Sequence, residues 1–317
     1  MHPIFRAGAT CIVISLPAAA LACASCGCTL SSDWDSQGYY ADAGLRLDLR
    51  YDYLTQAQLR SGTGAVNRSD YAIPSDRELE QRTINRYTTL GIDYSFNPDW
   101  AVNVQIPYVD RTHTTLSPGD TEVSGSSGNG PGDVRVVGRY QGLAESKNLG
   151  VQLGLKLPTG AFHQSFDRGP SAGTPLDRGV QLGTGTTDLL VGAYYYGAIS
   201  QDFDGFAQVL LQMPLDYREQ YKPGMSLSAN LGVRYVGFDI VTPQLQINTR
   251  VAKRDLGDAA DTPNSGGTLM YLSPGVTINL NRHIKLYAFV QLPIYQRVNG
   301  LQLAPRWTGT VGTRYVF

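Results

Sequence analysis

Three cysteines near the start of the chain are the residues whose spacing points most directly to chemistry. Cys23, Cys26 and Cys28 follow the pattern C-x2-C-x-C within "CASCGCTLSS". Thiolates this close in a flexible segment can converge on one soft ion, such as Cu or Zn. The alternatives are a disulfide that joins Cys23 to Cys26 or Cys28, a free thiol, or a lipid anchor on Cys23. A metal or redox role and a disulfide or anchoring role both stay open.

A histidine and a serine two residues apart offer a second kind of chemistry. His163 and Ser165 stand in "FHQSF", and a histidine can activate a serine for acyl transfer, as in a lipid-modifying acyl hydrolase. The pair would face lipid if the preceding strand continued through it. The Pro-Thr-Gly sequence at 158–160 is expected to end that strand, and no third residue that would orient the histidine can be identified. We therefore predict no enzyme and keep the hydrolase as the lesser alternative.

Charged residues that alternate with apolar ones form the third group. "GLRLDLRYDY", residues 44–53, puts Arg46, Asp48, Arg50 and Asp52 on one face and leucines and tyrosines on the other. A period of two indicates a strand. The polar faces of later alternating segments carry Asp93, Arg135, Arg139, Lys156, Arg234, Arg250 and Lys285. Bases outnumber acids in this set, which favours anions if the polar faces line a pore.

Composition excludes several other classes of function. Charged residues make up 17% of the 317 residues and the net charge is -1, so the chain carries fewer charges than the roughly 25% of an average soluble domain. The charge balance gives no reason to expect nucleic acid as a partner. After the first residues, no apolar run approaches the ~20 residues of a membrane helix. Any membrane crossing must therefore use strands.

The first residues predict export. "MHPIFR" is followed by the apolar run "CIVISLPAAALA", in which Ala20 and Ala22 are small enough for cleavage after residue 22. The expected organisation is a signal peptide over residues 1–22, a cysteine-containing periplasmic leader over 23–38 and a single barrel domain over 39–317.

About twelve alternating segments fill the rest of the chain, with long and short connections in turn. The long connections are expected near 55–81, 111–132, 159–185, 216–224, 255–267 and 296–304. An antiparallel meander with one elaborated rim is typical of outer-membrane barrels, which have long extracellular loops and short periplasmic turns. A sheet that spans hydrocarbon must close on itself, because every backbone polar group needs a partner within the protein. The predicted fold is an all-β, transmembrane, antiparallel up-and-down β-barrel in the outer membrane of a Gram-negative bacterium.

Aromatic residues support a membrane barrel by their placement. Those near expected strand ends, where interfacial girdles lie, are Trp100, Tyr108, Tyr140, Trp307, Tyr315 and Phe317. The final Phe317, with Tyr315 and Val311 on the same face, resembles the assembly signal of bacterial outer-membrane barrels and implies the barrel assembly machinery as a partner. The competing interpretation is a soluble sandwich or a lipocalin-like barrel, whose strands also alternate.

Two motifs in the middle of the chain resemble a particular family. "LGLKLPTGAF" and, about twenty residues later, "LGTGTTDLLVGAYYY" lie within residues 150–196. They are similar to the strand, loop and strand of outer-membrane proteins associated with the meta pathway of phenol degradation. This resemblance implies a passive channel or uptake barrel for small, often aromatic, compounds.

The sequence thus predicts an outer-membrane channel that passes small aromatic or anionic solutes through a charged lumen. Its expected partners are outer-membrane lipid and lipopolysaccharide, the assembly machinery, a small-molecule solute and a periplasmic partner of the leader. No cofactor is expected beyond Cu or Zn at the cysteines. The alternative is a structural or binding barrel in which the lumen ions pair with one another and the leader binds a metal or redox partner.

Overall fold

The computed structural model describes residues 43–317. The predicted signal peptide, the cysteine leader and the three cysteines that it contains lie outside the described residues, so these predictions stay untested. Within the described part, no helix is long and apolar enough to cross a membrane.

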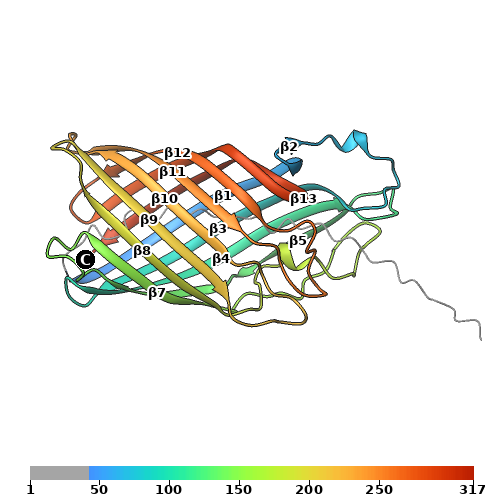
Figure 1. Cartoon of the computed structure of the whole chain (residues 1–317), viewed down its shortest axis with the longest axis horizontal. Coiled ribbons are helices and arrows are strands. Elements are labelled where there is room, and N and C mark those ends of the chain that lie inside the picture. The colour runs from blue at the N-terminus through green and yellow to red at the C-terminus, as the bar shows by residue number, and fades with distance from the viewer. Residues whose placement is uncertain (1–42) are drawn as a thin grey trace, which may run out of the picture.

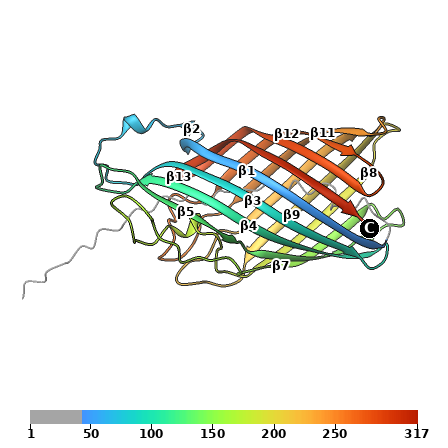
Figure 2. The same ribbon diagram turned by 180° about the vertical axis from the view of Figure 1, so that it is seen from behind.

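One antiparallel sheet closes on itself to form a tilted barrel (Figures 1 and 2). Its wall consists of β1 (Gly44–Gly62), β3 (Leu79–Ser95), β4 (Trp100–Leu116), β6 (Val134–Tyr140), β7 (Leu149–Leu157), β8 (Asp188–Ala198), β9 (Phe203–Pro214), β10 (Ser226–Tyr235), β11 (Val241–Ala252), β12 (Gly267–Asn279) and β13 (Ile284–Val316). Each strand pairs with its neighbour in sequence, and β13 pairs with β1 to close the ring. The predicted all-β, up-and-down antiparallel barrel is therefore confirmed.

The element β13 crosses the wall twice. Its residues 285–298 pair antiparallel with β12, and its residues 301–316 pair antiparallel with β1. The chain reverses between them at Asn299 and Gly300, where the glycine has a φ of +60° that favours this residue. The eleven wall elements thus make twelve crossings, as predicted. The long connection expected near 296–304 is wrong, because a tight Asn-Gly reversal joins the two runs.

The two rims differ as expected. At the end that holds the C-terminus, short turns join the strands, and asparagine side chains shape two of them: Asn97 accepts from the Trp100 amide, and Asn281 accepts from the Ile284 amide, each at 2.9 Å. The opposite rim carries the longer segments between strands (Figure 1). They contain the short strands β2 (Gly64–Ala65) and β5 (Ser124–Pro131) and the 3-10 turns η1 (Arg68–Asp70) and η2 (Arg178–Val180).

One predicted loop is largely strand. The Gly/Ser-rich segment 111–132 was expected to be a connection, but β4 runs on to Leu116 and pairs with β5 from Tyr108 to Thr115. A solvated antiparallel ladder tolerates glycine and serine, because it needs backbone pairing more than apolar side chains.

Along the strands, apolar side chains that are exposed on the outside alternate with polar side chains that are buried inside, as a membrane barrel requires. In β1, Arg46 and Arg50 are 4% and 8% exposed, whereas Leu49 between them is 50% exposed. In β10, Asn230 is buried and Leu231 is 57% exposed. A polar interior with an apolar exterior is the reverse of a soluble barrel and matches the lipid-facing band of an outer-membrane protein.

Exposed and half-buried aromatic residues gather at the turn rim. Trp100 packs on Tyr140 with ring centroids 4.6 Å apart, and Tyr235 contacts both Phe203 and Phe238 at 5.2 and 4.8 Å. These positions correspond to an interfacial girdle. Phe317 contacts Tyr315 at 4.7 Å, but its role as an assembly signal stays a prediction.

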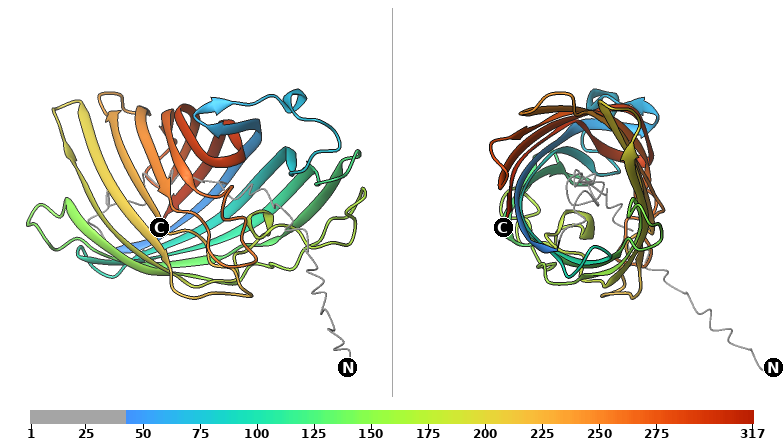
Figure 3. Two further views of the ribbon diagram at one scale, coloured as in Figure 1. Left: turned by 45° about the vertical axis from the view of Figure 1, so that its right-hand side comes forward. Right: turned by 90° about the vertical axis from the view of Figure 1, so that its left-hand side faces the viewer.

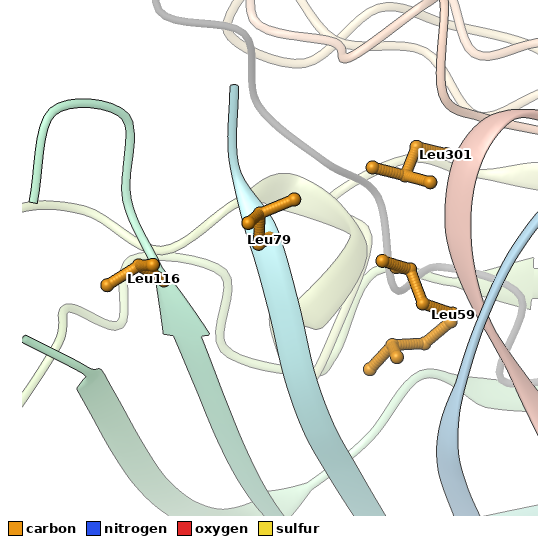
Figure 4. Close-up of a cluster of buried hydrophobic side chains, with 5 residues drawn as sticks. Leu59, Leu79, Leu116 and Leu301 are labelled. Carbon is orange, nitrogen blue, oxygen red and sulfur yellow. The ribbon is translucent and has the colours of Figure 1, made fainter. Parts of the chain in front are cut away.

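At the loop rim, leucines form an apolar cluster between neighbouring strands (Figure 4). Its members are Leu59, Leu79, Leu116, Leu301 and Leu303, and Val66 and Tyr71 of the β1–β3 connection pack against it. Burial of these side chains contributes about 1.5–3 kcal/mol each. The cluster therefore fastens the first long connection to the mouth of the barrel.

Candidate functional site

The candidate site is a chamber inside the loop half of the barrel. It has a volume of about 240 Å³ and is bounded by strands from all around the wall and by the segment 158–187, which we call the inner loop. Seven of the lining residues are basic and two are acidic, so the chamber is positively charged. The basic residues are Arg50, Arg111, Arg135, Lys156, Arg178, Arg250 and Lys253.

The inner loop connects β7 to β8 and folds into the mouth. The end-on view shows a short helical turn, η2, inside the ring of strands (Figure 3, right). Arg111 of β4 donates to the carbonyl oxygens of Gln181 at 2.7 Å and Gly179 at 3.4 Å. An arginine that bonds two main-chain carbonyls on either side of Val180 fixes the position of this turn against the wall.

The two motifs of the family resemblance build the anchor of the inner loop. Asp133, just before β6, accepts from the Gly160 amide at 3.1 Å and the Thr184 amide at 2.9 Å. Lys156 lies 3.3 Å from Asp133 and 3.0 Å from Asp188. Gly160 and Gly183 approach so closely that a side chain on either would meet the other's backbone. The motif residues thus hold both ends of the loop together.

A second contact fixes the outer part of the inner loop. His163 Nε2 lies 2.9 Å from a Glu219 carboxylate oxygen, and Arg178 donates to the same carboxylate at 3.5 Å. The hydrogen bond with His163 lowers the pKa of Glu219, and the charges of Arg178 and Arg218 act in the same direction. The β9–β10 connection is therefore tied to the inner loop.

The predicted His163–Ser165 pair does not form a strand that faces lipid. β7 ends at Leu157, and both residues belong to the inner loop. His163 bonds Glu219, while Ser165 forms an isolated bridge with Pro175. The Pro-Thr-Gly sequence at 158–160 ends the strand as expected, and within residues 43–317 the hydrogen bonds of the His163 ring go to Glu219 and not to Ser165.

The turn half of the lumen contains a dense network of ion pairs. Arg46 lies 3.0 Å from Asp93, which also bonds Arg139. Arg314 lies 3.1 Å from Asp48. Arg50 and Asp52 pair at 2.9 Å. The cavity that Arg46, Asp48, Asp93 and Arg314 line measures only about 20 Å³.

The predicted lumen residues thus fall into three groups. Arg50, Arg135, Lys156 and Arg250 line the chamber, and Arg50 also belongs to the ion-pair network through Asp52. Arg46, Asp48, Asp52, Asp93 and Arg139 belong to the ion-pair network. Arg234, which pairs with Asp204 at 3.0 Å, and Lys285, near the start of β13, lie at the turn end. Among residues 43–317, no group of three or more His, Cys, Asp or Glu residues could hold a metal ion.

Sequence reasoning missed several residues of the site. Arg111 was placed in a loop, although the alternation of "QIPYVDRTHT" continues through it and would have put it on the inner face. Asp133, Asp188 and Arg178 lie in or beside connections, where no periodicity indicates direction. Their roles depend on how the inner loop folds back, which a local pattern does not encode.

Comparison with solved structures places the fold among outer-membrane barrels. The COG4313 outer membrane channel from Pseudomonas putida F1 aligns with a TM-score of 0.64 at 13% identity, over 89% of this chain and 98% of that chain. The NalP autotransporter translocator domain from Neisseria meningitidis (TM-score 0.49, 11% identity, 89% and 91% covered) and the P. putida toluene transporter TodX (0.43, 10%, 86% and 90%) are more distant.

No family model matches the chain, and no curated protein matches it in sequence. At 13% identity, the likeness to the COG4313 channel concerns the fold. It confirms the predicted resemblance at the level of the fold, a closed antiparallel barrel of the outer-membrane type. No match confirms the particular meta-pathway family.

Proposed function

We propose that the protein is an outer-membrane channel that passes small anionic solutes through its lumen. The observation that carries this proposal is the chamber, in which basic lining residues outnumber acidic ones by seven to two. Oriented positive charge inside a low-dielectric wall concentrates anions and repels cations. The COG4313 protein is an outer membrane channel on the same fold, which agrees with this function.

The inner loop supports a selective pore rather than a wide one. It occupies the mouth and leaves a chamber of about 240 Å³, smaller than the roughly 300–1,000 Å³ of typical ligand pockets. Small solutes fit into a chamber of this volume, whereas macromolecules do not. The resemblance to the meta-pathway family extends the proposal to small aromatic anions, because Tyr87 and Tyr221 also line the chamber.

The test is single-channel conductance of the refolded barrel in a planar bilayer, with a salt gradient to measure ion selectivity. We expect steady current and a reversal potential that indicates anion preference. Arg135→Gln should move the reversal potential toward cations, whereas Arg82→Gln, an exposed arginine of β3, should leave it unchanged. A cation-selective barrel would contradict the proposal.

A closed structural or binding barrel is the second candidate, and the ion-pair network favours it. The cavity among Arg46, Asp93 and their neighbours is about 20 Å³, roughly the space of one water molecule. If these ion pairs stay intact, the folded protein will carry no measurable current across the bilayer. In that case a metal or redox role of the cysteine leader becomes the leading proposal, tested by metal content of the protein before and after Cys26→Ser and Cys28→Ser.

A further inference from the structure

We propose that the chamber is a binding site for a small organic dicarboxylate, held between Arg135 of β6 and Arg250 of β11. This inference rests on the proposed channel function and names the class of solute. It follows from the way in which the chamber's cations are paired, from where they stand on the wall and from the chamber's size.

Three of the seven basic residues of the chamber are already paired with acids of the protein. Lys156 lies within 3.3 Å of both Asp133 and Asp188, and Arg50 lies 2.9 Å from Asp52. Arg178 is close to the Glu219 carboxylate. These cations hold the loop and the wall together, and their charges are shared with acids of the protein.

Arg135 and Arg250 are different. Across the described residues 43–317, neither has a carboxylate within ion-pair distance; Arg135 has only a 3.5 Å hydrogen bond to the neutral Gln212 side chain, and the buried Nε of Arg250 has no hydrogen-bond partner. An enclosed guanidinium without an anion is costly. Two such guanidiniums in one chamber indicate a binding site whose ligand itself carries the negative charges that pair with them.

The two arginines stand on different parts of the wall. Four strands, β7 to β10, separate β6 from β11 in the ring, yet Arg250 and Arg50 are close enough to repel Arg135 electrostatically. The carboxylates of Asp188 and Asp133, which lie beyond ion-pair distance of Arg135, offset part of that repulsion. Guanidiniums that converge from separate strands can grip a ligand at two points. A solute with two anionic groups relieves the repulsion, while a monoanion offsets only one charge.

The size and the remaining walls of the chamber favour an organic body. Guanidinium binds carboxylate through two parallel hydrogen bonds, so each arginine can hold one carboxylate. Pro107, Val109 and Leu182 also line the chamber and give an apolar surface for a short carbon chain or ring. Inorganic phosphate would leave most of the 240 Å³ unfilled.

The first experiment is calorimetric titration of the full-length barrel, refolded in detergent, at low ionic strength. The probes are succinate, butyrate and inorganic phosphate; succinate and butyrate have the same number of carbons and differ in one carboxylate. We expect succinate to bind at least about tenfold more tightly than either, the ratio that 1.4 kcal/mol of extra interaction gives. Equal affinity of butyrate or phosphate would overturn the dicarboxylate assignment.

Variants then locate the site. Arg135→Gln and Arg250→Gln should each weaken succinate binding at least about tenfold, and Arg250→Lys, which keeps the charge without the planar fork, should give an intermediate affinity. The control is Arg82→Gln, whose side chain is exposed and outside the chamber. Arg250→Gln should also raise the midpoint of thermal unfolding without ligand, because it removes an unpaired charge; this readout shows that the variant is folded. Unchanged succinate affinity in both glutamine variants would overturn the site.

The bilayer measurement separates this inference from the channel proposal. A barrel that conducts anions but does not bind succinate would disprove the dicarboxylate site and leave the channel. A barrel that binds succinate, with loss in Arg135→Gln, but never conducts would support the site and disprove the channel.

Discussion

At the scale of single residues, Asp93 is the negative charge that two arginines share. It lies 3.0 Å from Arg46 and also bonds Arg139, and all three side chains are less than 10% exposed. Asp93→Asn would remove the carboxylate charge that both guanidiniums contact, and we expect it to lower the free energy of unfolding by about 3 kcal/mol. Urea unfolding in detergent micelles measures this loss. Asp76→Asn is the control: Asp76 is 87% exposed and 3.6 Å from an exposed Arg77, so its change should stay within about 0.5 kcal/mol.

Asp261, in the connection between β11 and β12, gives a pH dependence. Burial raises its pKa to about 6, although hydrogen bonds from Asn264 oppose the shift. A carboxyl whose folded pKa is raised contributes stability below its unfolded pKa near 4, and this contribution is lost as pH rises through about 6. We expect amide hydrogen exchange of residues 253–266, corrected for intrinsic rates, to quicken from about pH 4 to a plateau just above pH 6. Asp261→Asn should abolish that dependence; a dependence that persists in the variant would assign it to another group.

At the scale of elements, the inner loop depends on Arg111. A hydrogen bond to a charged donor contributes about 1.5–3 kcal/mol, and Arg111 donates two to the loop's carbonyl oxygens. Arg111→Met should increase, at least about tenfold, the fraction of molecules in which the inner loop has moved out of the mouth. We therefore expect faster tryptic cleavage within 158–187. We also expect larger and noisier single-channel currents. The control is Arg86→Met on the neighbouring β3, where the side chain is 35% exposed and 3.5 Å from Asp110. Cleavage at the same rate in both variants would show that Arg111 does not hold the loop.

The strands could be predicted from the sequence, whereas the inner loop could not. Alternation in "GLRLDLRYDY" fixes which side chains of β1 share a face, because side-chain direction in a strand has a period of two. The partner of each charge depends on register and on loop folding: Arg50 and Arg135 share the chamber, but Arg50 is paired with Asp52, whereas Arg135 has no carboxylate of residues 43–317 within ion-pair distance. The reversal at Asn299 was missed although Asn-Gly is a strong turn signal, because the expected strand ended too early.

At the scale of the whole molecule, the apolar side chains of the strands point outward, and the medium that they meet distinguishes a membrane barrel from a soluble one. Leu231, in the middle of β10, is 57% exposed, and its register partners are Ala207 and Ile247. If this face meets lipid, Leu231→Arg near the bilayer midplane should cost about 2–4 kcal/mol, measured by reversible unfolding from phospholipid vesicles. If it meets water, an arginine there is harmless or favourable.

The matched control for that measurement is a leucine of similar exposure outside the wall. Leu256 is 46% exposed and belongs to the connection between β11 and β12, where Leu256→Arg should change the free energy of unfolding by less than about 0.5 kcal/mol. The difference between the two variants therefore measures lipid contact rather than the loss of a leucine. Equal, small effects would contradict a membrane barrel and, with it, the channel, because the chamber of Arg135 and Arg250 would then be the interior of a soluble protein.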